Sequence, residues 1–196
     1  METKNAKSGY GLSGLLCLLL ICSGCRTPNR VDFSDPLLNQ RRVLLFGAID
    51  DGKAELTIQK LLYLDGKTNA PIDLFLQTPG GLLRGAFAIE QTMRTLRSPV
   101  NTYALSECNS GGALLLAAGT GKRRAFEGAV LMIHGLKIDP LAPKSFVELM
   151  QNNHEAFWRE RAHLPDGWLP FGEGTNHFFS AEQALQYGVV DEVVKR

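Results

Sequence analysis

Cysteine is scarce in this chain, and the scarcity limits how the protein can be stabilised. The sequence has 196 residues and four cysteines, of which Cys17, Cys22 and Cys25 lie within the first 25 positions. Cys108 is the one cysteine that follows, so no disulfide can form within the remainder of the chain. The fold must therefore depend on an ordinary hydrophobic core, which a chain of this length can supply.

The sequence also has no excess of charge of one sign and no internal repeat or low-complexity block. Its formal net charge of +1 gives no reason to expect a nucleic-acid partner. The apolar run at 15–22 is far shorter than the ~20 apolar residues that a stable membrane-spanning helix needs. With 44% hydrophobic and 21% charged residues, the composition is that of a single globular domain.

The first 25 residues are typical of an export signal. Lys4 and Lys7 precede the apolar run 15–22, and small residues follow that run at 23–24. A basic start, a short apolar centre and small residues at its end together define a secretory signal. We therefore assign residues 1–25 to a signal and expect the protein to be exported; a cytoplasmic location follows if the signal is not used.

Cys25 gives this signal a more specific interpretation. The segment 20–25 (LICSGC) resembles a bacterial lipobox, in which the cysteine after a small residue is lipidated and becomes the mature N-terminus. It departs from that pattern at Cys22, where leucine is usual. The favoured interpretation is that lipidated Cys25 attaches the protein to a membrane. The alternatives are a cleaved signal without lipid and a retained N-terminal anchor. Residues 26–40, polar and containing Pro28 and Pro36, are predicted to be a linker.

Hydrophobic periodicity predicts alternating strands and helices in the remaining domain, 41–196. Strands are expected at 42–49, 72–77, 100–105, 122–126, 130–133 and 189–194, and helices at 54–64, 82–96, 110–118, 145–162 and 181–187. A Pro- and Gly-rich loop is expected after the helix 145–162. This order predicts an α/β fold with a largely parallel sheet, whose catalytic groups lie at the carboxyl ends of the strands.

The segment 108–113 (CNSGGA) carries the clearest chemical signal. Ser110 lies between an expected strand and an expected helix and is followed by two glycines, and His134 ends another apolar run. A serine at a tight strand-to-helix turn is exposed as a nucleophile, and an imidazole can take its proton. The pattern indicates acyl-transfer chemistry. The plainer alternatives are a helix-capping Ser110, a structural His134 and an ordinary turn at Gly80 and Gly81.

Several ordered segments resemble the ClpP family of serine peptidases, within the ClpP/crotonase superfamily. They are RVLLFGAID, QTPGG, NSGGALLLAAG, RRAFEGAVLMIH and FFSAEQALQYGVVDEV. The resemblance covers about 41–194 and implies a repeated β-β-α spiral with a projecting handle helix. It also implies that Ser110 is the nucleophile, that His134 is the general base, and that Gly81 and Gly111 form the oxyanion hole. No metal or cofactor is expected.

The third member of the triad is open. The family's aspartate falls on Gly172, where no carboxylate is present, and Glu173 is the nearest acidic residue. Asn176 can orient an imidazole without supplying charge, and another group or none remains an alternative. The sequence departs from the family again at Cys108 and Asn109, before the nucleophile, and at 135–136, after the histidine.

The expected helix 145–162 matches the position of the family's handle and carries an apolar stripe, which indicates self-association. The family forms heptameric rings, often stacked in pairs, so the resemblance implies a homo-oligomer. His154 and His163 are expected at the surface or an interface, whereas Phe157 and Trp158 are expected to pack. Cys108 is expected to be a small packing residue.

Three functions follow from these features. The favoured one is an exported serine endopeptidase that cleaves peptides or unfolded proteins. Because ATP is not expected outside the cytoplasm, an ATPase partner is doubtful. The second is an inactive ring subunit, motivated by the missing aspartate. The third is a membrane-associated Ser-Lys peptidase of the same superfamily, with Lys137 or Lys144 as the base.

Overall fold

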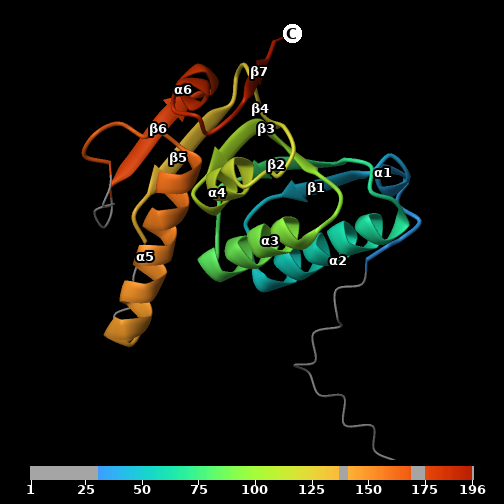
Figure 1. The fold of residues 1–196 in the computed structure, drawn as a ribbon, viewed down its shortest axis with the longest axis horizontal. Coiled ribbons are helices and arrows are strands. Elements are labelled where there is room, and N and C mark those ends of the chain that lie inside the picture. The colour runs from blue at the N-terminus through green and yellow to red at the C-terminus, as the bar shows by residue number, and fades with distance from the viewer. Residues whose placement is uncertain (1–30, 137–140, 169–174, 196) are drawn as a thin grey trace, which may run out of the picture.

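The computed structural model describes residues 31–136, 141–168 and 175–195, which form a mixed α/β domain around one seven-stranded sheet. Figure 1 shows the sheet running through the domain, with α2 and α3 side by side along one face and α5 extending away from it. The strands are β1 (Arg42–Phe46), β2 (Ile72–Thr78), β3 (Val100–Asn109), β4 (Arg123–Phe126), β5 (Val130–His134), β6 (Asn176–Ser180) and β7 (Glu192–Val194).

The sheet is largely parallel, as predicted. The strands follow the order β1-β2-β3-β4-β7, and all of these neighbours pair in parallel. β5 also pairs in parallel with β3, whereas β5 and β6 form an antiparallel ribbon. Parallel strands need crossover connections, which the helices between them provide.

β3 is long enough to have two different neighbours along one of its edges. Its first half pairs with β4 at 102–104, and its last residues, 107–109, pair with β5. The sheet therefore divides at β3, and the division brings the end of β5 beside the end of β3. This arrangement decides the geometry of the site described below.

The core lies between the sheet and the helices α2 (Asp51–Lys67), α3 (Leu83–Thr95) and α4 (Gly111–Ala117). Alternate residues of β1 and β2 point into it, and every residue of α4 is buried. On the opposite face of β1, Leu44 and Phe46 are exposed. The helix α4 is apolar on all sides, and a helix of this kind is stable only in the interior of a domain.

Local capping explains two of the helix boundaries. The Asp50 carboxylate accepts a hydrogen bond from the Lys53 N–H and begins α2. At the other end of the chain, Ser180 and Gln183 form a reciprocal capping box that begins α6 (Ala181–Gln186). In both cases a side chain satisfies N–H groups that the first helical turn leaves without a partner.

Arg41 joins the start of β1 to the loops that precede β2 and β3. Its backbone has a φ of 56°, an uncommon value for a residue other than glycine. Its guanidinium donates hydrogen bonds to the carbonyls of Leu64, Thr68, Ala70 and Pro71 and to the Ser98 hydroxyl. Such a fan of bonds uses the planar arrangement of donors that only arginine offers.

The structure differs from the sequence-based expectations at two places. The described end of the predicted linker, 31–40, contains the short helix α1 (Pro36–Asn39), and Val31 and Leu38 are buried in the core, so this end belongs to the domain. The strand β6 lies where part of a loop was expected. None of the described helices is long and apolar enough to span a membrane.

The helix α5 (Lys144–Arg161) packs on the domain through only one of its ends. Its buried residues, His154, Phe157 and Trp158, all lie in the C-terminal half. In the N-terminal half, Phe146 is 56% exposed and Leu149 is 63% exposed. The C-terminal half therefore anchors the helix, and Figure 1 shows its N-terminal end extending away from the sheet.

Candidate active site

Ser110 forms a strained turn between β3 and α4. Its φ of 52° and ψ of −118° lie outside the regions that non-glycine residues usually adopt. The turn is held from both sides, because the Ser110 N–H donates to the Met132 carbonyl at 2.6 Å and the Ser110 carbonyl accepts from the Leu114 N–H at 3.1 Å. Such a turn presents the serine hydroxyl at the end of the sheet, as hydrolase nucleophiles require.

Glycines around Ser110 allow the main chain to approach it closely. A Cβ at Gly80 would lie 2.7 Å from the Ser110 Cβ, and one at Gly112 would lie 2.4 Å from the Thr78 Cγ2. Both distances are shorter than a side chain can tolerate. The two glycines therefore explain why this turn packs so tightly against the end of β2.

The N–H groups of Gly81 and Gly111 lie near each other beside the nucleophile. A Cβ built on Gly111 would be 3.9 Å from the Gly81 nitrogen, and one on Gly81 would collide with the Ile49 backbone at 2.2 Å. Within the described part of the chain, neither N–H donates a hydrogen bond. Two N–H groups that have no acceptor and lie next to a serine can stabilise a tetrahedral oxyanion.

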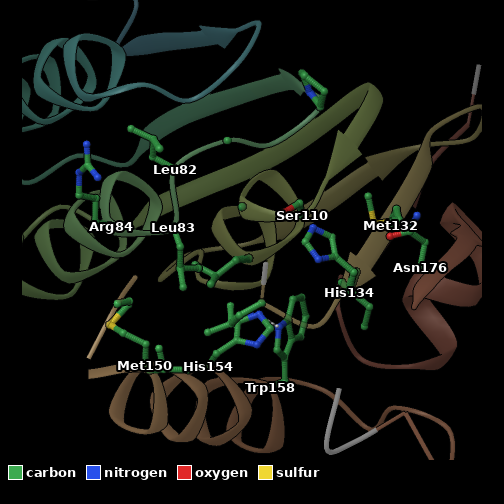
Figure 2. Close-up of a pocket in the computed structure, with 18 of the residues that line it drawn as sticks. Leu82, Leu83, Arg84, Ser110, Met132, His134, Met150, His154, Trp158 and Asn176 are labelled. Carbon is green, nitrogen blue, oxygen red and sulfur yellow. Dashed lines mark hydrogen bonds between the residues drawn. The ribbon is translucent and has the colours of Figure 1, made fainter. Parts of the chain in front are cut away.

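His134 is brought to Ser110 by the division of the sheet at β3. It is the last residue of β5, whose Met132 pairs with Asn109 immediately before the nucleophile. Both side chains line one cavity, and Figure 2 shows the His134 imidazole turned toward Ser110. The Nδ1 atom of His134 contacts the carbonyl oxygen of Gly135. Since a carbonyl only accepts, Nδ1 carries the hydrogen and Nε2 is left as the proton acceptor.

The two candidates for the third triad position have different outcomes. Glu173 lies outside the described residues, so its position relative to His134 stays a prediction. Asn176 is paired with His134 across the β5–β6 ribbon and lines the same cavity. Among the described residues, however, no hydrogen bond joins the Asn176 side chain to the imidazole.

The cavity beside Ser110 has a volume of about 630 Å³ and a largely apolar lining. One wall comes from the main domain, including Leu83, Leu114 and Ile133. The opposite wall comes from α5, which contributes Phe146, Val147, Met150, His154 and Trp158. Figure 2 shows Met150, His154 and Trp158 along the helix face that points toward the site. No described lining residue is an aspartate or glutamate.

His154 was expected at the surface or an interface, and this expectation is wrong. The residue is only 7% exposed and lies in the cavity wall, because α5 turns its i, i+4 stripe of residues 150, 154 and 158 toward the site. The Trp158 indole N–H donates to His154 Nε2 at 3.1 Å. Burial first, and the nearby His134 second, lower the pKa of His154 to about 4, so the ring is neutral at pH 7.

The other sequence-based candidates fall outside the chemistry. Phe157 and Trp158 are buried, as expected of packing residues. Cys108 is fully buried, and burial raises the pKa of its thiol, which keeps it protonated and unreactive. Lys144 begins α5 as an exposed residue and does not line the cavity, and Lys137 lies outside the described residues. Within the described ranges no cluster of side chains is suited to hold a metal ion.

Comparison with known proteins agrees with this geometry. The family model described as "Clp protease" matches residues 26–138, more than half of the chain. The chain belongs to the Clp protease family. A relative of this family from Carsonella ruddii (strain PV), named "ATP-dependent Clp protease proteolytic subunit", is 28% identical over 179 residues, which are 84% of this chain and 89% of the relative.

The sequence predicts that Ser110, His134, Gly81 and Gly111 share one site, and the structure brings these four residues together. The cavity wall formed by α5 was not predicted. The signal was present in the spacing of Met150, His154 and Trp158, which repeats every four residues. In a helix of unknown orientation, however, that spacing fits a core stripe as well as a cavity wall.

The buried, neutral His154 makes a testable contribution to stability. The unfolded chain binds a proton at His154 near pH 6.5, whereas the folded chain resists protonation down to about pH 4. The free energy of unfolding should therefore fall as the pH falls through this window, by up to roughly 3 kcal/mol. In His154→Gln, which keeps an acceptor for Trp158 but does not titrate, this part of the dependence should disappear.

Urea unfolding of both proteins at intervals from pH 7 to pH 4 measures the difference. Because other groups titrate equally in the two proteins, the informative quantity is the difference between their slopes. Parallel curves for wild type and His154→Gln would show that His154 is not buried as a neutral ring.

Proposed function

We propose that the protein is a serine endopeptidase that forms an acyl-enzyme on Ser110. One observation carries the proposal: the strained Ser110 turn, the His134 imidazole and the N–H groups of Gly81 and Gly111 all border one cavity. If Ser110 only capped the helix, or if His134 were only structural, two neighbouring N–H groups without an acceptor would have no purpose. Membership of the Clp protease family supports the same chemistry.

The proposed reaction has two halves. Nε2 of His134 takes the hydroxyl proton as Ser110 Oγ attacks the peptide carbonyl, and the N–H groups of Gly81 and Gly111 stabilise the oxyanion. His134 then gives the proton to the leaving amine, which leaves an acyl-enzyme on Ser110. In the second half, His134 takes a proton from water as the water attacks the acyl carbonyl. His134 then returns this proton to Ser110 Oγ, which releases the acid product and regenerates the serine.

Peptides and unfolded proteins are the proposed substrates. An extended segment would bind beside the sheet edge with one side chain in the cavity. The relative from Carsonella ruddii is named as ATP-dependent. For this chain we propose cleavage without an ATPase, because the signal-like residues 1–25 favour a location where ATP is not expected.

Replacing either member of the Ser110–His134 pair tests the reaction. Ser110→Ala and His134→Ala should each lower kcat/KM for a fluorogenic peptide by at least ~10³-fold, because the nucleophile or its base is lost. Ser110→Ala should also abolish labelling by a fluorophosphonate. Lys144→Ala is the control, because it also replaces a side chain by alanine but lies outside the cavity, and it should retain activity and labelling.

Two other results would point to the alternative functions. If folded wild-type protein neither cleaved peptides nor reacted with the fluorophosphonate, the inactive ring subunit would be the better description. The lack of any described carboxylate in the cavity favours that alternative. If Lys137→Ala or Lys144→Ala abolished turnover while His134→Ala spared it, the Ser-Lys mechanism would replace the one proposed.

We also propose that the protein is a homo-oligomer in which the free half of α5 pairs two copies, and that a separate head-to-tail contact can close a ring. Phe146 and Leu149 are more than half exposed there, and Leu141, just before the helix, is 92% exposed. Apolar side chains grouped on a projecting helix are costly in water unless another surface covers them. A second copy of the chain presents the same apolar helix face, so the contact can be self-complementary.

A charge placed in this apolar group should weaken the assembly. Leu149→Glu should shift the protein toward monomer in sedimentation velocity, because the carboxylate would have to be buried without a partner. Asn153→Glu adds the same charge to an exposed position of the same helix and is the matched control. If both variants sediment as the wild type does, the free half of α5 does not form the contact.

Membrane attachment through lipidated Cys25 is a further proposal, supported by the lipobox-like segment 20–25. In a bacterial host, the full chain should incorporate radiolabelled palmitate and sediment with membranes, and Cys25→Ser should do neither. Cys22→Ser is the matched control and should behave like the wild type. Equal palmitate incorporation by the Cys25→Ser variant would contradict the proposal.

A further inference from the structure

Gly135 is buried and comes directly after β5, the strand that ends at His134. The ladder of strand hydrogen bonds therefore does not extend to Gly135. Across the ranges that the structure describes, no backbone N–H donates to the carbonyl of Gly135. A buried carbonyl without a donor is costly, and the group that reaches it is Nδ1 of His134.

Other groups around the imidazole do not take this role in the described structure. Asn176 faces His134 across the ribbon, but its side chain makes no hydrogen bond to the ring in the part of the chain that is described. His154 lies in the same cavity, and its Nε2 already accepts from the Trp158 indole. The cavity lining that is described contains no carboxylate.

From these contacts we infer that the main-chain carbonyl of Gly135 orients His134, in the place that a carboxylate takes in a catalytic triad. The inference rests on the proposed peptidase function and specifies how its base is held. The site is then a Ser110–His134 dyad with a backbone acceptor, and Gly135 is a positioning residue.

The carbonyl fixes the tautomer without exchanging a proton. When Ser110 Oγ attacks, its proton moves to Nε2, and the hydrogen on Nδ1 stays on the ring, bonded to the Gly135 oxygen. The imidazolium that forms is stabilised by the carbonyl dipole and not by a full negative charge. Because His154 is neutral at pH 7, it adds no positive charge next to the imidazolium of His134.

An amide-to-ester replacement tests this role without changing any side chain. Incorporating the α-hydroxy analogue of leucine at position 136 converts the Gly135 carbonyl from an amide into an ester, which is a weaker acceptor. The N–H of Leu136 donates no hydrogen bond to any described residue, so its loss should matter little. We expect kcat to fall about tenfold with KM unchanged, because the weaker acceptor orients the base less well without touching the substrate cavity.

Matched proteins separate this effect from its alternatives. Leucine inserted at position 136 by the same method restores the amide. An ester at Leu164, whose N–H also donates no hydrogen bond to a described residue, gives the general cost of an ester. Glu173→Gln and Asn176→Ala test the two side chains that are candidates for the same role, and the loss of kcat in each should be smaller than in the position-136 ester. Circular dichroism supplies the folded fraction by which every rate is divided.

Two outcomes would overturn the inference. One is a position-136 ester whose kcat falls no further than that of the Leu164 ester. The other is a loss of a hundredfold or more in Glu173→Gln or Asn176→Ala, which would make that side chain the orienting group. If the restored-amide protein has no peptidase activity at all, the proposed function fails and the inference with it, so the two failures are distinguishable.

Discussion

The close approach of main chain to main chain around Ser110 is the constraint on which the rest of the site depends. The turn at Ser110 adopts a positive φ and is wedged between Gly80 on one side and the Met132 carbonyl on the other. Side chains at Gly80, Gly81 or Gly112 would collide with their neighbours, so the glycines permit the turn. The strain is maintained because buried strands and the fully buried helix α4 surround it.

Much of this arrangement follows from the sequence, for identifiable reasons. Apolar, β-rich runs marked β1, β2, β3 and β5, and a serine followed by two glycines marked the nucleophile turn. The strand β6 was missed because Phe178 and Phe179 are its only apolar residues, and so short a run does not stand out from the Gly-containing segment before it. The burial of His154 was missed for a different reason: the orientation of α5 is set by contacts with distant strands, which local spacing does not encode.

The helix α5 links the two proposed properties of the protein. Its C-terminal half supplies His154 and Trp158 to the catalytic cavity, and its N-terminal half, which also borders the cavity through Phe146, exposes Leu149 and more than half of Phe146. Burial first, and the nearby His134 second, lower the pKa of His154 to about 4, so this part of the α5 wall carries no charge at pH 7. The substrate cavity and the surface proposed for self-association are therefore built on one element.

As the nucleophile, Ser110 becomes acylated during turnover. Rapid mixing of the protein with an activated ester, followed by intact-mass and peptide mass spectrometry, measures this acylation directly. We expect a burst of released alcohol equal to the number of active sites and an acyl adduct confined to the peptide that contains Ser110. Turnover with neither a burst nor an adduct, or an adduct on another residue, would contradict it.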